Sequence, residues 1–248
     1  MTLGVFSATN PRTFLGVSAG AILLAGFGGL VVSRGTENTM LAILVLAVLF
    51  AVTAARSVRL RDFGVSSTRW VRSAAVSAVV VSLLAAVLVT LMIIVADRNP
   101  TFYQDFASFT VQAHGYEVAD GVRYASDGPG MPVGTFALTG LCVFLSFLMG
   151  TVAGTALGAV SGARGTRACV VAALGSFVAA YGVGAVLMVL DVNIAAPWPG
   201  VPMFAVVVCV VSGLVLAWAL RTERRPMPAV VPELPGVSPE PRGGVAEH

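Results

Sequence analysis

Residues 133–160, VGTFALTGLCVFLSFLMGTVAGTALGAV, contain no charged side chain. A helix of about 20 apolar residues crosses the roughly 30 Å hydrocarbon core of a bilayer, so this stretch is long enough to span a membrane. The whole chain agrees with that interpretation, because 57% of its residues are hydrophobic and only 11% are charged, against about 25% charged residues in soluble domains. The sequence therefore predicts an all-α, polytopic membrane protein.

Working outward from this stretch, similar uncharged segments lie between the charged residues on both sides. They are residues 13–33, 38–55, 73–96, 168–190 and 201–220. Together with 133–160 they predict a transmembrane domain of six helices over 13–220. The last helix is expected to begin after Pro197, Pro199 and Pro202, because proline is unfavourable inside a helix. The remainder is an N-terminus at 1–12, an external segment at 97–132 and a Pro-rich tail at 221–248, which is expected to be disordered.

The arginines predict the orientation. All 15 basic residues are arginine, and this preference, with much alanine, valine and glycine, is typical of a GC-rich bacterial genome. Positive charge collects in short cytoplasmic loops. Arginine is concentrated in the loops after the second and fourth spans and in the tail, and Arg12 precedes the first span, whereas the opposite side is mainly acidic. We therefore expect a bacterial plasma-membrane protein with both termini in the cytoplasm.

The external segment has its own pattern. Asn99 followed by Pro100 suits the start of a helix, and the phenylalanines at 102, 106 and 109 fall on one of its faces. We expect a short interfacial helix on the outer leaflet, followed by a polar loop over 116–132 with a short hairpin. The alternative is that the same aromatic face packs on the outer ends of the spans.

Several enzyme classes are disfavoured. The chain has no lysine, so it lacks the phosphate-binding Walker A lysine of an ATPase. Its histidines, His114 and His248, lie outside the spans, and an intramembrane serine protease needs a histidine inside them. Cys142, Cys169 and Cys209 have no other ligand at metal-binding spacing. We expect no enzyme activity, no metal and no cofactor bound by this chain.

Glycines in the fourth span predict close helix packing. They recur every four residues, at Gly150, Gly154, Gly158 and Gly162, and small residues at this spacing let two membrane helices approach closely. Gly16 and Gly20 repeat the pattern over a shorter length in the first span. The sequence leaves open whether the partner is a helix of the same chain or of a second copy.

The loop after the second span, residues 56–72, reads RSVRLRDFGVSSTRWVR. Gly64 should interrupt any helix, Ser66 or Ser67 can cap the third span, and Trp70 is expected at the membrane interface. The simplest interpretation is a short positive loop near anionic lipid. Five arginines, one acid and an exposed Phe-Gly turn exceed what such a loop needs.

Six spans with both termini inside, together with FGVSSTRW between spans two and three, resemble the permease subunit of a bacterial type-2 ABC exporter. That family has a Gly-x-Ser-Arg-Arg-like turn followed by an aromatic residue. Gly64, Ser66, Arg69 and Trp70 correspond to it, although the paired arginine is spread out. The likeness covers the overall topology over 12–221. The family carries external re-entrant helices between its last two spans, where this chain has only the short link 191–200.

The resemblance implies a loop that docks on a separate ATPase subunit, which would bind ATP and Mg, and a second permease copy or paralogue. Arginines would then supply charge, and Phe63 and Val65 would fill a groove. The implied docking residues are Arg59, Arg61, Phe63, Gly64, Val65, Ser66 and Arg69. Apolar spans would favour a lipid-like or amphipathic cargo. The competing classes are a membrane scaffold or sensor that uses the external segment, and an ATP-independent carrier or channel. No basic cluster with interleaved aromatics indicates a nucleic-acid partner.

Overall fold

The computed structural model describes residues 5–32, 35–97, 116–119, 122–125, 133–189 and 197–221. The expected interfacial helix after Asn99 and the tail at 222–248 lie outside these residues.

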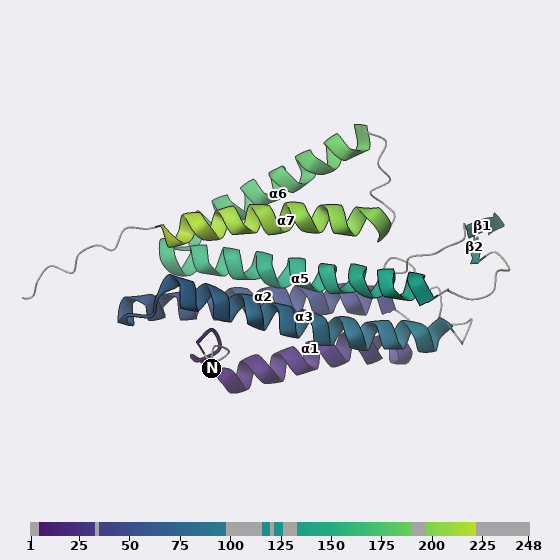
Figure 1. The fold of residues 1–248 in the computed structure, drawn as a ribbon, viewed down its shortest axis with the longest axis horizontal. Coiled ribbons are helices and arrows are strands. Elements are labelled where there is room, and N and C mark those ends of the chain that lie inside the picture. The colour runs from purple at the N-terminus through teal and green to yellow at the C-terminus, as the bar shows by residue number, and fades with distance from the viewer. Residues whose placement is uncertain are drawn as a thin grey trace, which may run out of the picture.

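Each predicted span corresponds to one long helix (Figure 1). The helices are α1 (Pro11–Val32), α2 (Gly35–Ser57), α3 (Ser67–Asp97), α5 (Val133–Arg164), α6 (Thr166–Val189) and α7 (Pro197–Leu220), with a 3-10 helix η1 (Val58–Phe63) between α2 and α3. Strands β1 (Tyr116–Ala119) and β2 (Val122–Ala125) pair antiparallel, with Tyr116 opposite Ala125. This hairpin lies within the stretch where the sequence predicts a polar loop with a short hairpin.

Among the described residues, 5 helices are long and apolar enough to cross a membrane, namely α1, α2, α3, α5 and α7. The sixth predicted span coincides with α6. Its apolar part within the described residues, Thr166–Ala179, is shorter than the other five. The chain is thus a multi-pass membrane protein by the length and composition of its helices.

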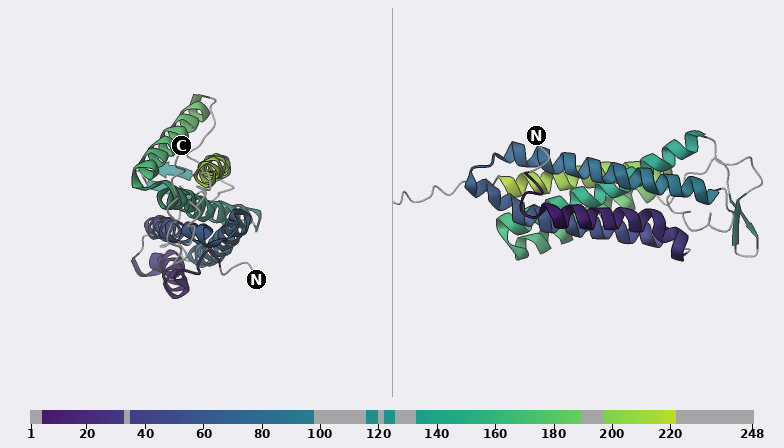
Figure 2. Two further views of the ribbon diagram at one scale, coloured as in Figure 1. Left: turned by 90° about the vertical axis from the view of Figure 1, so that its left-hand side faces the viewer. Right: turned by 90° about the horizontal axis from the view of Figure 1, so that it is seen from below.

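Helix α5 occupies the centre of the bundle. It packs against α2 and α3 on one side and against α6 and α7 on the other, whereas α1 packs on α2 and α3 at the edge (Figures 1 and 2). Helix α6 diverges from α7 with increasing distance from its start (Figure 1). The first three helices and the last two therefore meet mainly through α5.

Two helix starts differ from expectation. Helix α3 begins at Ser67, six residues before the predicted 73. The arginines at 69 and 72 are exposed in its first turns and do not interrupt the helix. Helix α7 begins at Pro197 and contains Pro202, so the expectation that it starts after Pro202 was wrong. Prolines in a first helical turn cost little, since those N–H groups have no intrahelical partner; only Pro202 removes a bond.

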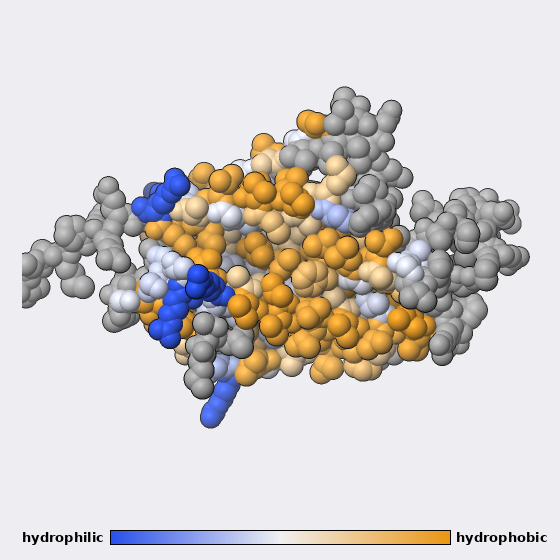
Figure 3. All heavy atoms as spheres, viewed as in Figure 1, coloured by the Kyte–Doolittle hydropathy of each residue, from blue (hydrophilic) through white to orange (hydrophobic). Residues whose placement is uncertain are grey.

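The arginines of the helices gather at one end of the bundle, where α1 begins and α7 ends (Figures 1 and 3). The hairpin lies at the opposite end, beyond the ends of α3 and α5. Between the two ends the visible face is mostly apolar (Figure 3), with many exposed side chains such as Leu44, Leu83 and Leu214. An exposed apolar surface with arginines at one end is expected of a chain embedded in lipid. We call the arginine-rich side the basic end.

Candidate functional site

The candidate site is the connection between α2 and α3 at the basic end, residues 56–72, which we call the elbow. Helix η1 extends α2 by six residues. Gly64 ends it with a φ of 92°, a backbone conformation that residues other than glycine rarely adopt. The backbone N–H of Val65 donates to the Leu60 carbonyl over 3.4 Å. The Ser66 hydroxyl accepts from the Arg69 N–H at 3.3 Å, which confirms the predicted N-cap of α3.

Basic side chains form the outer surface of the elbow. The exposed arginines are Arg56, Arg59, Arg69 and Arg72. Two of the predicted docking residues, Arg59 and Arg69, therefore face solvent. Two further predicted docking residues, Arg61 and Phe63, have their backbone in η1, but their side chains are outside the described residues.

Trp70 forms the inner surface of the elbow. Its side chain is 0% exposed, and its indole N–H donates to the Ser57 hydroxyl over 3.0 Å. The sequence predicts Trp70 at the membrane interface, but the structure buries its side chain inside the bundle, where this hydrogen bond and the Phe6 ring hold it away from lipid. The bond joins the last residue of α2 to the first turn of α3 across the elbow.

Val58 and Val65 also point inward. Val58 is buried, and Val65 is half-buried against the protein's own core. Part of the Val65 side chain therefore packs within the chain, and the expectation that it fills a groove of a partner stays a prediction. The exposed side chains of the elbow include Arg59 and Arg69, whereas its valines are buried or half-buried.

Phe6 holds the elbow from the N-terminal side. It is fully buried, and its backbone N–H donates to the Ser73 hydroxyl of α3 over 3.0 Å. Its ring centroid lies 5.4 Å from that of Phe50 in α2 and 5.9 Å from that of Trp70. Phe14 of α1 completes the group, 6.0 Å from Phe6. Phe6, which precedes the first helix, thus fastens α1, α2 and α3 together. Its sequence context does not predict this role.

Replacing Phe6 with alanine is expected to lower the free energy of unfolding by about 3 kcal/mol, since a fully buried aromatic ring is lost from a packed cluster. The measurement is thermal or denaturant unfolding of the purified chain in detergent micelles. Leu15→Ala is the matched control, because Leu15 is 67% exposed on α1 and its truncation should change stability by less than about 0.5 kcal/mol. Equal stability of the two variants would contradict the packing role of Phe6.

The glycine face of α5 packs on α2 of the same chain. A Cβ at Gly154 would overlap the backbone of Ala47, one at Gly158 would overlap that of Ala51, and one at Gly162 would lie 2.5 Å from the Ala55 carbonyl oxygen. A Cβ at Gly150 would lie 2.8 Å from the Ile43 side chain. The packing partner of the glycine face, which the sequence leaves open, is therefore α2 of the same chain. In α2, Ala47, Ala51 and Ala55 repeat the same four-residue spacing. That alanine series is the signal that sequence reasoning missed.

This packing continues to the base of the elbow. A Cβ at Gly162 would also lie 2.5 Å from the Val58 side chain in η1. The central helix α5 therefore touches the first residue of η1 as well as α2, the helix that leads into it.

Gly16 and Gly20 behave differently. Both are exposed on α1, and a Cβ built on either would meet nothing within 4 Å. The expectation that they form a shorter packing groove was wrong within this chain, because α1 presents the opposite face, with Phe14 and Ala21, to the bundle.

The elbow has two chemically different sides. It presents guanidinium groups outside and a hydrogen-bonded aromatic cluster inside. Among the described residues no three His, Cys, Asp or Glu side chains lie close enough together to hold a metal ion. Comparison with protein-family models, with curated proteins and with solved structures returns no match to this chain, so its function is inferred from its sequence and geometry.

Proposed function

We propose that this chain is the membrane-spanning permease subunit of an ABC transporter and couples to a separate ATPase subunit through the elbow. The observation that carries the proposal is the construction of the elbow. Arg59 on η1 and Arg69 in the first turn of α3 are exposed, and the segment that carries them is locked to three long helices. A loop that only attracts anionic lipid needs the arginines, but it does not need the hydrogen bond and packing that fix it to the helices.

The lock gives the elbow a mechanical role. The bond between Ser57 and Trp70 joins α2 to α3, and the contact of Val58 with the glycine face joins η1 to α5. A partner that pushes on η1 would therefore displace three helices as one body, because packed helices shift as rigid elements. Rocking of these helices against α6 and α7 would open the pathway alternately to the two sides.

In this proposal the work is divided between subunits. The chain has no lysine to contact a nucleotide, so ATP and Mg would bind to the ATPase. The chain would cross a bacterial plasma membrane six times, with α6 as the fifth crossing, and would place both termini and the basic end in the cytoplasm. A second copy or a paralogue would complete the pathway.

The proposal predicts a reading frame with a Walker A motif beside the chain's own gene, and its test is co-expression of the chain with that ATPase. A stable complex whose ATPase activity changes on reconstitution into bilayer discs supports the permease role. An ATPase that purifies separately, with unchanged activity when the chain is added, contradicts it.

The orientation gives a separate prediction. In a variant without the three native cysteines, a cysteine at Thr68 in the exposed first turn of α3 should resist a membrane-impermeant maleimide in intact cells. A cysteine at Glu37, exposed in the first turn of α2 at the opposite end, should react. Both positions should react once the cells are permeabilised. Labelling of position 68 in intact cells would place the basic end outside and exclude docking on a cytoplasmic ATPase.

A further inference from the structure

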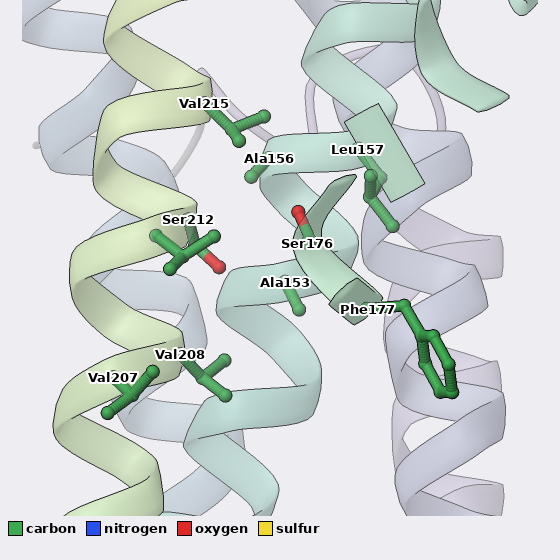
Figure 4. Close-up of a pocket in the computed structure, with 10 residues that line it drawn as sticks. Ala153, Ala156, Leu157, Ser176, Phe177, Val207, Val208, Ser212 and Val215 are labelled. Atoms are coloured by element: carbon green, nitrogen blue, oxygen red, sulfur yellow. The ribbon is translucent and has the colours of Figure 1, made fainter. Parts of the chain in front are cut away.

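A cavity of about 170 Å³ lies between α5, α6 and α7 (Figure 4). Its lining is aliphatic and aromatic except for two hydroxyl groups, those of Ser176 on α6 and Ser212 on α7. The small residues Ala153 and Ala156 of α5 form its floor. Because α6 diverges from α7 (Figure 1), the cavity occupies the narrow part of a wedge between these helices, which we call the α6–α7 wedge.

The surroundings of the α6–α7 wedge are apolar. Phe177, which lines the cavity, is 71% exposed, and Leu174 on the same helix is 63% exposed. On α7, Val210 and Leu214 are exposed by more than half. A dry apolar cavity of about 150 Å³ takes up an apolar guest. In a bilayer the guest available at such a surface is a lipid acyl chain.

Arg164 on α5 and Trp218 on α7 lie on the helix faces that line the cavity, closer to the basic end. Leu157 of the lining and Arg164 are seven residues apart, and Val215 and Trp218 are three apart, so each pair shares one face of its helix. At 1.5 Å per residue Arg164 lies about 10 Å along α5 from Leu157. The Arg164 guanidinium donates to the Trp218 carbonyl over 2.7 Å and lies 3.8 Å from the centroid of the Trp218 ring.

Arg164 retains binding capacity. Its Nε–H is buried and has no hydrogen-bond partner among the described residues, and buried donors normally have one. The segments 133–189 and 197–221 also carry Arg167 and Arg221 but no aspartate or glutamate. Three cations at the same end of α5, α6 and α7 therefore lack an anion within these helices.

We propose that the α6–α7 wedge binds an anionic phospholipid of the bilayer, with its phosphate at Arg164 and Trp218 and one acyl chain in the cavity beneath them. The distance of about 10 Å between the two parts fits within one leaflet, since the whole hydrocarbon core measures roughly 30 Å. The site lies on the opposite side of α5 from α2 and α3, and it does not require an ATPase.

Tryptophan quenching by brominated lipid tests this site in the full chain. The chain has three tryptophans. With Trp198→Phe, the two that remain are Trp70, which is buried, and Trp218, which is 44% exposed. The chain is placed in bilayer discs that contain phosphatidylglycerol or phosphatidylcholine brominated near the head of the acyl chain. Half-maximal quenching should need about fivefold less of the anionic lipid, the preference expected from one arginine near the surface.

Matched variants separate the two parts of the site. Arg164→Gln should abolish the anionic preference, and Arg167→Gln, which leaves the Trp218 contact intact, should reduce it; Arg72→Gln, also exposed at the basic end but on α3, should retain it. Ala153→Leu fills the cavity and should weaken quenching by both lipids, whereas Ala137→Leu, exposed elsewhere on α5, should not.

Equal quenching by the two lipids in the parent chain overturns the proposal, as does an anionic preference that survives Arg164→Gln. Absence of quenching by either lipid also overturns it, because no acyl chain would then lie beside Trp218.

Discussion

Replacing Gly158 with alanine is expected to prevent stable assembly of the bundle, with a loss of about 3 kcal/mol or more in the free energy of unfolding. The added Cβ would overlap the backbone carbonyl of Ala51 in α2. A backbone group cannot rotate away as a side chain can, so α2 and α5 must separate along their shared face. The measurement is the yield of monodisperse protein in detergent and its thermal unfolding midpoint.

Gly213→Ala is the matched control. It adds the same methyl group to α7, where a Cβ would meet nothing within 4 Å, and the higher helix propensity of alanine makes the expected effect neutral or slightly stabilising. Equal stability of Gly158→Ala and Gly213→Ala would contradict the close packing of α5 on α2.

Gly26 on α1 sharpens the comparison. A Cβ there would lie 2.6 Å from the side chain of Leu88, so the damage from Gly26→Ala should be relieved by shortening Leu88 to alanine. No side-chain change on α2 should relieve Gly158→Ala, because the obstacle there is main chain. Rescue by Ala51→Gly would show that the geometry at Gly158 is wrong.

The second large effect is expected from reversing charge on the elbow. The double variant Arg59→Glu and Arg69→Glu should lower the affinity of the chain for the proposed ATPase subunit about a hundredfold. Like charges placed opposite one another at an interface cost several kcal/mol, and each 1.4 kcal/mol corresponds to a factor of ten in affinity. Because both side chains are exposed, the thermal stability of the chain itself should not change. Affinity is measured by titrating labelled ATPase onto the chain in bilayer discs.

Arg12→Glu with Arg221→Glu is the control of equal net charge. Both residues are exposed at the basic end but lie outside the elbow, and their reversal should leave binding within about threefold, since exposed charges farther apart than roughly 10 Å are screened by salt. Equal loss in both double variants would mean that the ATPase responds to overall charge and not to the elbow. Undiminished binding by the elbow variant would refute docking there.

The positions of the helices were largely predictable, because a bilayer demands long uncharged stretches and charged residues delimit them. The predicted 168–190 and the observed α6, Thr166–Val189, differ at each end by two residues or fewer. The prediction was weaker where a helix runs past the apolar region. Ser67–Arg72 joins α3 because Ser66 caps it, and a hydropathy pattern does not register a cap.

The interior of the elbow was harder to predict, because it depends on contacts between residues far apart in the sequence. Phe6 and Ser73 form a hydrogen bond, yet neither position has an unusual local pattern. Trp70 looked like an interfacial residue from its place beside arginines. Its burial depends on Ser57, on the far side of the Gly64 turn. The glycine spacing of α5 predicted close packing, but only the three-dimensional arrangement shows that the alanines of α2 receive it.

The central place of α5 has a consequence for biosynthesis. Helix α2 is made long before α5, with residues 58–132 between them, which at 5–20 residues per second takes on the order of several seconds. During that delay the alanine face of α2 has no partner and is open to lipid or to an insertion chaperone. Arrival of α5 closes this face and also provides the surface on which α6 and α7 settle. The fourth long helix that the structure describes is therefore the one on which both the earlier and the later helices depend for their final packing.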